Sequence, residues 1–226
     1  TQELGSSLVA ISDPATYMDA DVYIGWYLGN GGENLQKLIS RIIEHTANSL
    51  QVTFCAFGGS GGGFASLYFL ANCDSVHKAL VWNCQTVVEK YYPRFWKRIA
   101  EILFGEKDVD GKRFSELFRS QCIATSLLDN VDKFEGKSFF YLQNGLDWHL
   151  KNHAEPFVNK LGLGSEECGS FSSKNDLVFF QGNWGEGHAV PPKSLLTRCL
   201  RWPITLGVIN SNQTSQNANT QNLSNF

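Results

Sequence analysis

"CAFGGSGGGFASL", residues 55–67, places one serine, Ser60, between two glycines and three more. Glycine costs conformational entropy in an ordered chain, so this density indicates backbone turns or close contacts that a side chain would prevent. The stretch fits G-x-S-x-G, with an apolar run before it (51–58) and a helical pattern after it (63–73). A strand, a sharp turn and a helix in this order would raise the serine hydroxyl above the edge of a sheet, which predicts a nucleophile.

A glycine-rich loop between a strand and a helix can also bind phosphate. The Walker pattern is missing its Lys-Ser/Thr pair, and the dinucleotide fingerprint meets Phe64 where its third glycine would stand. No acidic residue ends the following strand. The nucleophile interpretation is therefore favoured over a phosphate loop or a purely structural turn.

The rest of the chain alternates short apolar runs with segments of helical period, which predicts an α/β fold with a mostly parallel sheet covered on both faces. Expected strands are 6–12, 21–26, 51–58, 78–83, 137–144 and 176–182, and expected helices are 33–50, 63–73 and 192–202. The helical stretch 86–135 is too long for a plain crossover and is interpreted as a lid insertion. Residues 1–207 would form one catalytic domain, and the polar tail 208–226 is expected to be disordered.

Composition excludes several classes of function. The chain has 226 residues and a net charge of −3, so no basic field favours nucleic acid. No apolar run approaches the roughly 20 residues that span a bilayer, and we see no secretory signal, although the chain begins with Thr1. Six scattered cysteines lack zinc-ligand spacing, which predicts reduced thiols in a cytoplasmic protein and no metal site.

A serine nucleophile needs a base, and the base needs an acid to orient it. In folds of this kind they follow in the order serine, acid, histidine, each just after a strand. Asp147 in "YLQNGLDWHL" and His188 in "FFQGNWGEGHAV" meet that requirement. His149 and His153 are rivals expected to line the pocket or face solvent.

Other acidic side chains fit the role of the acid less well. Asp129 and Asp132 precede a predicted strand rather than following one. Asp13 and Asp21 fall between the first two expected strands and are assigned to turn chemistry.

An acyl-transfer site also needs N–H groups for the developing oxyanion. We expect the backbone N–H of Gly61 at the helix start and that of Trp26, with Tyr27 close behind, although Trp26 could simply be a core aromatic. The residues expected to bind substrate are Tyr27, Asn83, Gln85, Trp148 and Trp184. The segment 89–98 interleaves four aromatics with four basic residues, which suits sugars, CoA phosphates or an anionic polymer but equally suits an amphipathic helix.

Four segments together resemble the α/β-hydrolase-fold proteins of bacterial capsular polysaccharide loci, and are similar to the accessory secretory proteins that O-acetylate adhesin glycans. They are "GGSGGGFASL", "ALVWNCQTVVEKYY", "YLQNGLDWHLKNHAEPF" and "NWGEGHAVPPK", and the resemblance covers roughly residues 20–205. Cys84 departs from the proline expected in "WNPQT". The resemblance implies an α/β-hydrolase fold and a triad on Ser60, Asp147 and His188.

The resemblance further implies acetyl transfer from acetyl-CoA, as a substrate rather than a bound cofactor, to sugar hydroxyls of a capsular polysaccharide. It allows peripheral association with a capsule assembly complex. A triad by itself indicates only acyl transfer, because the choice between water and a sugar hydroxyl as the acyl acceptor depends on pocket shape. An esterase or polysaccharide deacetylase, and a non-catalytic scaffold of a glycan-export assembly, are the alternatives.

Overall fold

The computed structural model describes residues 5–29, 33–164, 171–174 and 176–201. Its centre is a five-stranded sheet in the order β1-β2-β3-β5-β4. The strands β1 (Phe54–Gly59), β2 (Val76–Trp82), β3 (Ser138–Asn144) and β5 (Leu177–Gly182) are parallel, and β4 (Phe171–Lys174) joins β5 in the antiparallel direction. The predicted α/β class with a mostly parallel sheet is confirmed, and β4 is a strand that the sequence pattern did not indicate.

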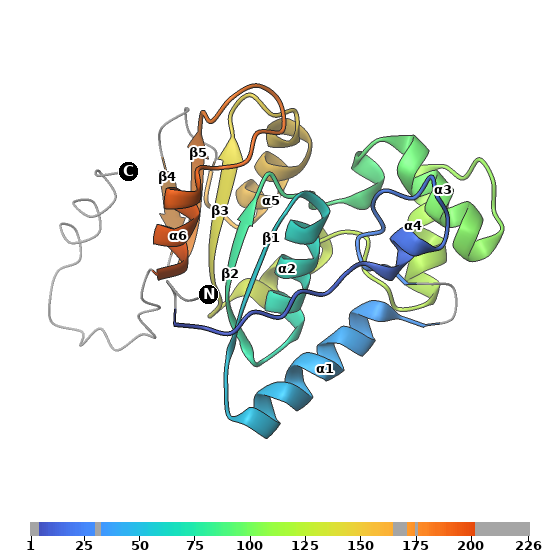
Figure 1. Ribbon diagram of the computed structural model, residues 1–226. Helices are drawn as coiled ribbons and strands as arrows, with labels where there is room; N and C mark the ends of the chain where they lie inside the picture. The colour runs from blue at the N-terminus through green and yellow to red at the C-terminus, as the bar shows by residue number, and fades with distance from the viewer. Residues whose placement is uncertain (1–4, 30–32, 165–170, 175, 202–226) are drawn as a thin grey trace, which may run out of the picture.

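Helices cover both faces of the sheet (Figure 1). On one face, α1 (Leu35–Leu50), α2 (Ser60–Asn72) and α5 (Glu155–Lys160) pack into the larger core cluster. On the other face, α6 (Lys193–Arg201) closes a smaller cluster with Cys199 against Leu80, Phe140 and Leu142. Every residue of β3 is buried, which explains why its sequence reads as a continuous run rather than an alternation.

The segment between β2 and β3 is mostly helical, and the lid role of residues 86–135 stays a prediction. It contains η3 (Val88–Lys90), α3 (Pro93–Phe104), α4 (Gly111–Ser120) and η4 (Leu128–Phe134). In Figure 1, α3 and α4 lie together at the end of the domain away from α6. Trp96 of α3 meets Phe114 of α4 at a ring distance of 5.3 Å, and both belong to the main core. The insertion is therefore packed onto the domain.

The first two expected strands, 6–12 and 21–26, are wrong. Residues 6–10 are exposed, and none of the described strands pairs with them. Asp13, which precedes the short helix η2 (Pro14–Tyr17), instead accepts hydrogen bonds from the backbone N–H groups of Ala15, Gly25 and Tyr27. These backbone N–H groups donate to a carboxylate instead of to a neighbouring strand. The turn role predicted for Asp13 is confirmed.

Three further findings concern the chain as a whole. No helix within the described residues is long and apolar enough to cross a membrane. The five cysteines within the described residues are free thiols, and three of them are buried. The predicted tail 208–226, the domain end at 207 and Cys168 lie outside the described residues.

Candidate functional site

Ser60 lies at the sharp turn between β1 and α2. Its φ of +54° is in the left-handed region, which is strained for a residue with a side chain. The turn brings β1 so close to the first turn of α2 that a Cβ added to Gly58 would lie 2.7 Å from the carbonyl carbon and oxygen of Gly62. The glycines therefore permit the contact that holds the serine at the carboxyl end of the strand, at the start of the helix.

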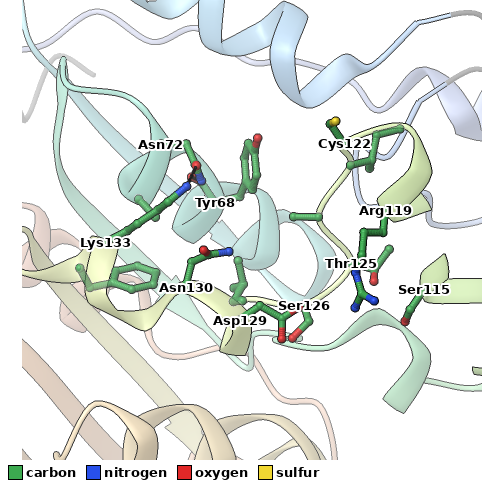
Figure 2. Close-up of a pocket in the computed structure, with 15 residues that line it drawn as sticks. Tyr68, Asn72, Ser115, Arg119, Cys122, Thr125, Ser126, Asp129, Asn130 and Lys133 are labelled. Carbon is green, nitrogen blue, oxygen red and sulfur yellow. Dashed lines mark hydrogen bonds between the residues drawn. The ribbon is translucent and has the colours of Figure 1, made fainter. Parts of the chain in front are cut away.

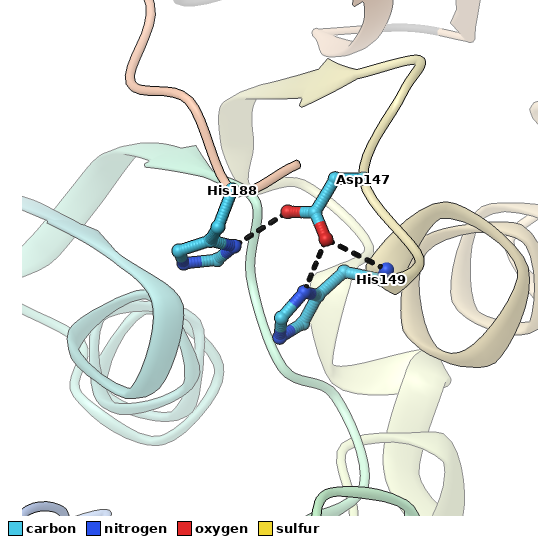
Figure 3. A group of neighbouring side chains, drawn as sticks. All are labelled: Asp147, His149 and His188. Atoms are coloured by element: carbon cyan, nitrogen blue, oxygen red, sulfur yellow. Dashed lines mark hydrogen bonds and ion pairs between the residues drawn. The ribbon is translucent and has the colours of Figure 1, made fainter. Parts of the chain in front are cut away.

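Asp147 and His188 come from the loops that follow β3 and β5. The Nδ1 atom of His188 lies 2.5 Å from Oδ2 of Asp147 (Figure 3). Asp147 is 3% exposed, whereas the His188 side chain is 41% exposed. The structure thus brings the predicted acid and base into direct contact, although they are 41 residues apart in the chain.

Two buried asparagines at the strand ends hold these loops. Asn144, the last residue of β3, donates from Nδ2 to the carbonyls of Gly185 and Gly187, at 2.8 and 2.7 Å. Asn83 donates from Nδ2 to the carbonyl of Ala189 at 2.7 Å and accepts the backbone N–H of Asn144 on Oδ1 at 2.8 Å. Both ends of the Asn83 amide are therefore engaged with the His188 loop and β3. Sequence reasoning missed Asn144, whose place at the end of a strand was the available signal.

Asp147 holds a second imidazole as well. Its Oδ1 atom accepts hydrogen bonds from the backbone N–H of His149 at 3.0 Å and from Nδ1 of the same residue at 2.6 Å (Figure 3). The rings of His149 and His188 have centroids 4.4 Å apart. His149 and His153 are both buried, so neither faces solvent.

Gln85, which follows β2, is hydrogen bonded to Ser60. Its Nε2 atom donates to Oγ of Ser60 at 3.0 Å and lies 3.2 Å from Nε2 of His149. Its Oε1 atom accepts the indole N–H of Trp26 at 2.6 Å. Within the described residues Ser60 has no hydrogen bond to His188, so the serine and the predicted base are not in direct contact in this conformation.

The surroundings set the charge of each group. Burial alone would raise the pKa of Asp147, but the hydrogen bonds from His149 and His188 outweigh it and hold that pKa far below its usual value. Burial lowers the pKa of His149 despite the neighbouring carboxylate. Burial also lowers the pKa of His153, to about 3. At neutral pH the site therefore contains an ionised Asp147 beside a neutral His149.

The expected oxyanion donors differ in their availability. Gly61 is in the first turn of α2, where backbone N–H groups have no partner within the helix. Trp26 and Tyr27 both have positive φ, at 52° and 57°. The N–H of Tyr27 donates to Asp13 at 2.9 Å, whereas the backbone N–H of Trp26 has no partner among the described residues. Of these two, Trp26 is the one whose N–H is unpaired within the part of the chain that the structure describes.

Aromatic side chains of the insertion reach the site. The ring of Tyr91 stacks on Trp148 at 5.7 Å and lies 5.7 Å from the ring of His149. Tyr92 lies 5.0 Å from Trp148 and is half exposed, and the guanidinium of Arg94 lies 4.6 Å from the ring of Phe95. These rings form an aromatic patch beside His149, which consists of Tyr91, Tyr92, Phe95 and Trp148.

The remaining predicted substrate residues, Tyr27 and Trp184, make other contacts. The hydroxyl of Tyr27 donates to the carbonyl of Ile11 at 2.7 Å. Trp184 packs with Phe180 on the α6 side of the sheet. Trp96, in the aromatic and basic segment, is buried in the core, and Arg98 pairs with Asp19 and Glu101. The segment therefore combines a core-packing face with the aromatic patch.

Asp147, His149 and His188 offer ligand atoms within 4.8 Å of one another, as a metal site would require. Each Nδ1 atom, however, already shares a proton with an oxygen of Asp147, at 2.6 and 2.5 Å. A metal bound through Nδ1 would have to displace those protons, because a ligating nitrogen must be unprotonated. The donor geometry fits hydrogen-bonded imidazoles better than a metal centre.

A cavity of about 360 Å³ lies beside the later part of α2 (Figure 2). It opens between the later part of α2, the helix α4 and η4, and its lining includes Tyr68, Asn72, Arg119 and Lys133. Ser60, Asp147 and His188 do not line it.

Comparisons with known proteins give structural likenesses only. No protein-family model matches the sequence, and no curated protein matches it. A puromycin hydrolase is 17% identical over 76% of this chain and 24% of its own, with a TM-score of 0.48. The capsule O-acetyltransferase of Neisseria meningitidis serogroup A is 16% identical over 73% of this chain and 61% of its own, with a TM-score of 0.47. A Thermus thermophilus protein is 15% identical over 75% of this chain and 64% of its own, with a TM-score of 0.49.

The chain thus spans about a quarter of the puromycin hydrolase and less than two thirds of the other two proteins. These likenesses are too distant to carry an argument about activity. The parallel sheet, the strand–serine–helix turn, and the acid and histidine after later strands are the features of an α/β-hydrolase fold. The predicted fold is confirmed.

Proposed function

We propose that this protein is a serine-dependent O-acetyltransferase that moves an acetyl group from acetyl-CoA to sugar hydroxyls of a bacterial capsular polysaccharide. The observation that supports it most is the strained Ser60 at the start of α2, with a buried Asp147 bonded to His188 on neighbouring loops. Such an arrangement serves nucleophilic acyl transfer.

In the proposed reaction His188 takes the proton of Ser60 as its Oγ attacks the acetyl carbonyl. The C–O bond forms while the carbonyl electrons move to the oxyanion, which the N–H groups of Gly61 and Trp26 would stabilise. Collapse expels the CoA thiolate, which takes the proton from His188, and leaves acetyl-Ser60. His188 then deprotonates the sugar hydroxyl, which attacks the acetyl-enzyme. As the second oxyanion collapses, the bond to Oγ breaks, and Ser60 takes the proton from His188. Asp147 holds the imidazole and stabilises its cation.

The choice of acceptor rests on two features. The aromatic patch beside His149 offers ring faces of the kind on which sugars stack, with Arg94 next to it. The resemblance of the four sequence segments described above implies the same acceptor and the same donor, and the scattered cysteines predict a cytoplasmic setting. The insertion that carries Tyr91 and Tyr92 would then act as a lid over the site.

One observation favours an esterase or polysaccharide deacetylase as the second candidate. The His188 side chain is 41% exposed, which leaves the base open to water. Hydrolysis of the acetyl-enzyme competes with transfer wherever water reaches it.

Product analysis distinguishes the two candidates. The protein is incubated with acetyl-CoA and a panel of capsule polymers, and O-acetyl sugar and free acetate are quantified by NMR. We expect O-acetyl sugar to form faster than acetate, and Ser60→Ala to abolish both products while the unfolding curve is retained. Acetate alone would replace transfer with hydrolysis, and undiminished turnover in Ser60→Ala would remove the mechanism.

A further inference from the structure

We propose that Asp147 supports two arms at this site, with His188 on one oxygen and a His149–Gln85 arm on the other, and that the second arm positions Ser60. Gln85 contacts the proposed nucleophile itself, whereas His149 acts through Gln85 and is a positioning residue. The inference rests on the proposed function, because it assigns roles around a reactive Ser60.

The orientation of the Gln85 amide follows from its partners. The indole N–H of Trp26 can only donate, so the atom 2.6 Å from it must be the carbonyl oxygen Oε1. The NH2 group therefore points the other way, with Ser60 Oγ at 3.0 Å and His149 Nε2 at 3.2 Å. Its two hydrogens match these two acceptors, and the amide is fully satisfied in a site where it is 0% exposed.

This assignment fixes the tautomer of His149. Because Gln85 donates to Nε2, that nitrogen must be unprotonated, so the proton lies on Nδ1 and is donated to Asp147 Oδ1 at 2.6 Å. The chain of donors runs from His149 to Asp147, and from Gln85 to both His149 and Ser60. Four side chains from three distant segments of the sequence thus form one continuous network.

The network prepares Ser60 for attack. By donating to Oγ, Gln85 occupies a lone pair of the serine and leaves the hydroxyl hydrogen to turn toward a base. As that hydrogen leaves, negative charge grows on Oγ, and a hydrogen bond to a charged atom is stronger than one to a neutral hydroxyl. The Gln85 bond therefore stabilises the transition state more than the ground state, which is the requirement for acceleration.

The charge balance of the network requires a neutral His149. The groups facing it are Asp147, His188, and the rings of Tyr91, Trp148 and His153. One carboxylate cannot balance two imidazolium ions whose rings lie 4.4 Å apart. Because His149 stays neutral, the charge of Asp147 is available to His188 when that residue takes the serine proton. A protonated His149 would also turn a second donor toward Gln85 and displace it from Ser60.

The test measures the reactivity of Ser60 with a fluorophosphonate probe, independently of any acceptor. In His149→Asn the amide nitrogen replaces Nδ1 as donor to Asp147, but Gln85 loses its acceptor. We expect labelling to slow by about 10- to 100-fold. Gln85→Glu keeps an acceptor for Trp26 and removes the donor to Ser60, so it should slow labelling to the same extent.

The matched control is His153→Asn. His153 is equally buried and close to His149, but its Nδ1 accepts from the backbone N–H of Thr86, an acceptor role that asparagine can keep. This variant should label within about twofold of wild type. Proton NMR adds a direct readout: the wild type should show two strongly downfield N–H resonances from the two imidazoles on Asp147, and His149→Asn should lose one of them.

The double variant His149→Asn/Gln85→Glu decides whether the two residues form one arm. Because both act through the same bond to Ser60, its labelling should be no slower than that of the slower single variant. Wild-type labelling in His149→Asn, or losses that multiply in the double variant, would overturn the inference. If His149→Asn fails to fold, labelling of Gln85→Glu at the wild-type rate would overturn the inference instead. Absence of labelling in the wild type would instead refute the proposed function.

Discussion

Replacing Asp147 by asparagine tests the site most sharply, because the structure determines how the new amide would lie. Oδ1 of Asp147 accepts two hydrogen bonds from His149, one of them from its backbone N–H, whereas Oδ2 accepts one bond from His188. Asparagine has a single acceptor oxygen. Placed at the Oδ1 position, this oxygen accepts two hydrogen bonds, whereas at the Oδ2 position it would accept one. Its NH2 group would then face His188.

A donor facing Nδ1 forces His188 to place its own proton on Nε2. In that tautomer His188 cannot take the proton of Ser60, and we expect turnover to fall by about 10³- to 10⁴-fold. Asp147→Asn replaces the charge-assisted bond with His188 by a neutral one of opposite direction and weakens the two bonds from His149, which lose their charged acceptor. Because a hydrogen bond to a charged group contributes about 1.5–3 kcal/mol and a neutral one about 0.5–1.5 kcal/mol, the free energy of unfolding should fall by roughly 2 kcal/mol.

Three measurements on the same preparation check this expectation. Hydrolysis of p-nitrophenyl acetate and fluorophosphonate labelling report on Ser60, and urea denaturation followed by tryptophan fluorescence reports on stability. Asp129→Asn is the matched control, because Asp129 lines the separate cavity, and it should leave labelling unchanged. Turnover of Asp147→Asn above a tenth of wild type would refute the reasoning.

Two further predictions concern stability. Burial lowers the pKa of His149, and that of His153 to about 3, so between about pH 6.5 and 3 the unfolded chain binds more protons than the folded one. The free energy of unfolding should therefore fall with falling pH in this range, by up to about 1.4 kcal/mol per pH unit for His153. His153→Asn should flatten this pH dependence, measured by urea denaturation. An unchanged slope would contradict the lowered pKa of His153. Gly58→Ala places a Cβ 2.7 Å from backbone atoms of Gly62, so it should lower the free energy of unfolding by about 1–3 kcal/mol and slow labelling. Gly62→Ala has no atom within 4 Å of its Cβ, so it should raise the free energy of unfolding by up to about 1 kcal/mol through helix propensity. Equal stabilities of these two variants would show that the turn tolerates a side chain at Gly58.

The sequence predicted the elements whose evidence is local. The strand before Ser60 and the helix after it are marked by the apolar run, the glycines and the helical period, and the structure has β1 and α2 there. The order in which Asp147 and His188 follow later strands was also readable, because parallel strands bring their carboxyl ends to one edge. The functional roles of these residues stay predictions.

The expected strands 6–12 and 21–26 show where local evidence fails. An apolar run becomes a strand only if another strand offers it hydrogen bonds, and here Asp13 takes the backbone donors of Gly25 and Tyr27 instead. A carboxylate competing with a sheet for the same N–H groups leaves no mark in periodicity. Pattern alone could not separate the two outcomes.

The tertiary structure alone decided how the side chains of the site are connected. Gln85 joins Trp26, Ser60 and His149 across separations of 59, 25 and 64 residues, and Asn144 reaches Gly185 across 41. Hydrogen bonds of this kind depend on directions and distances of about 3 Å, which only the packed chain sets. The sequence by itself determined a strand–serine–helix turn and the residues that could serve it; folding decided that one buried carboxylate would hold two histidines.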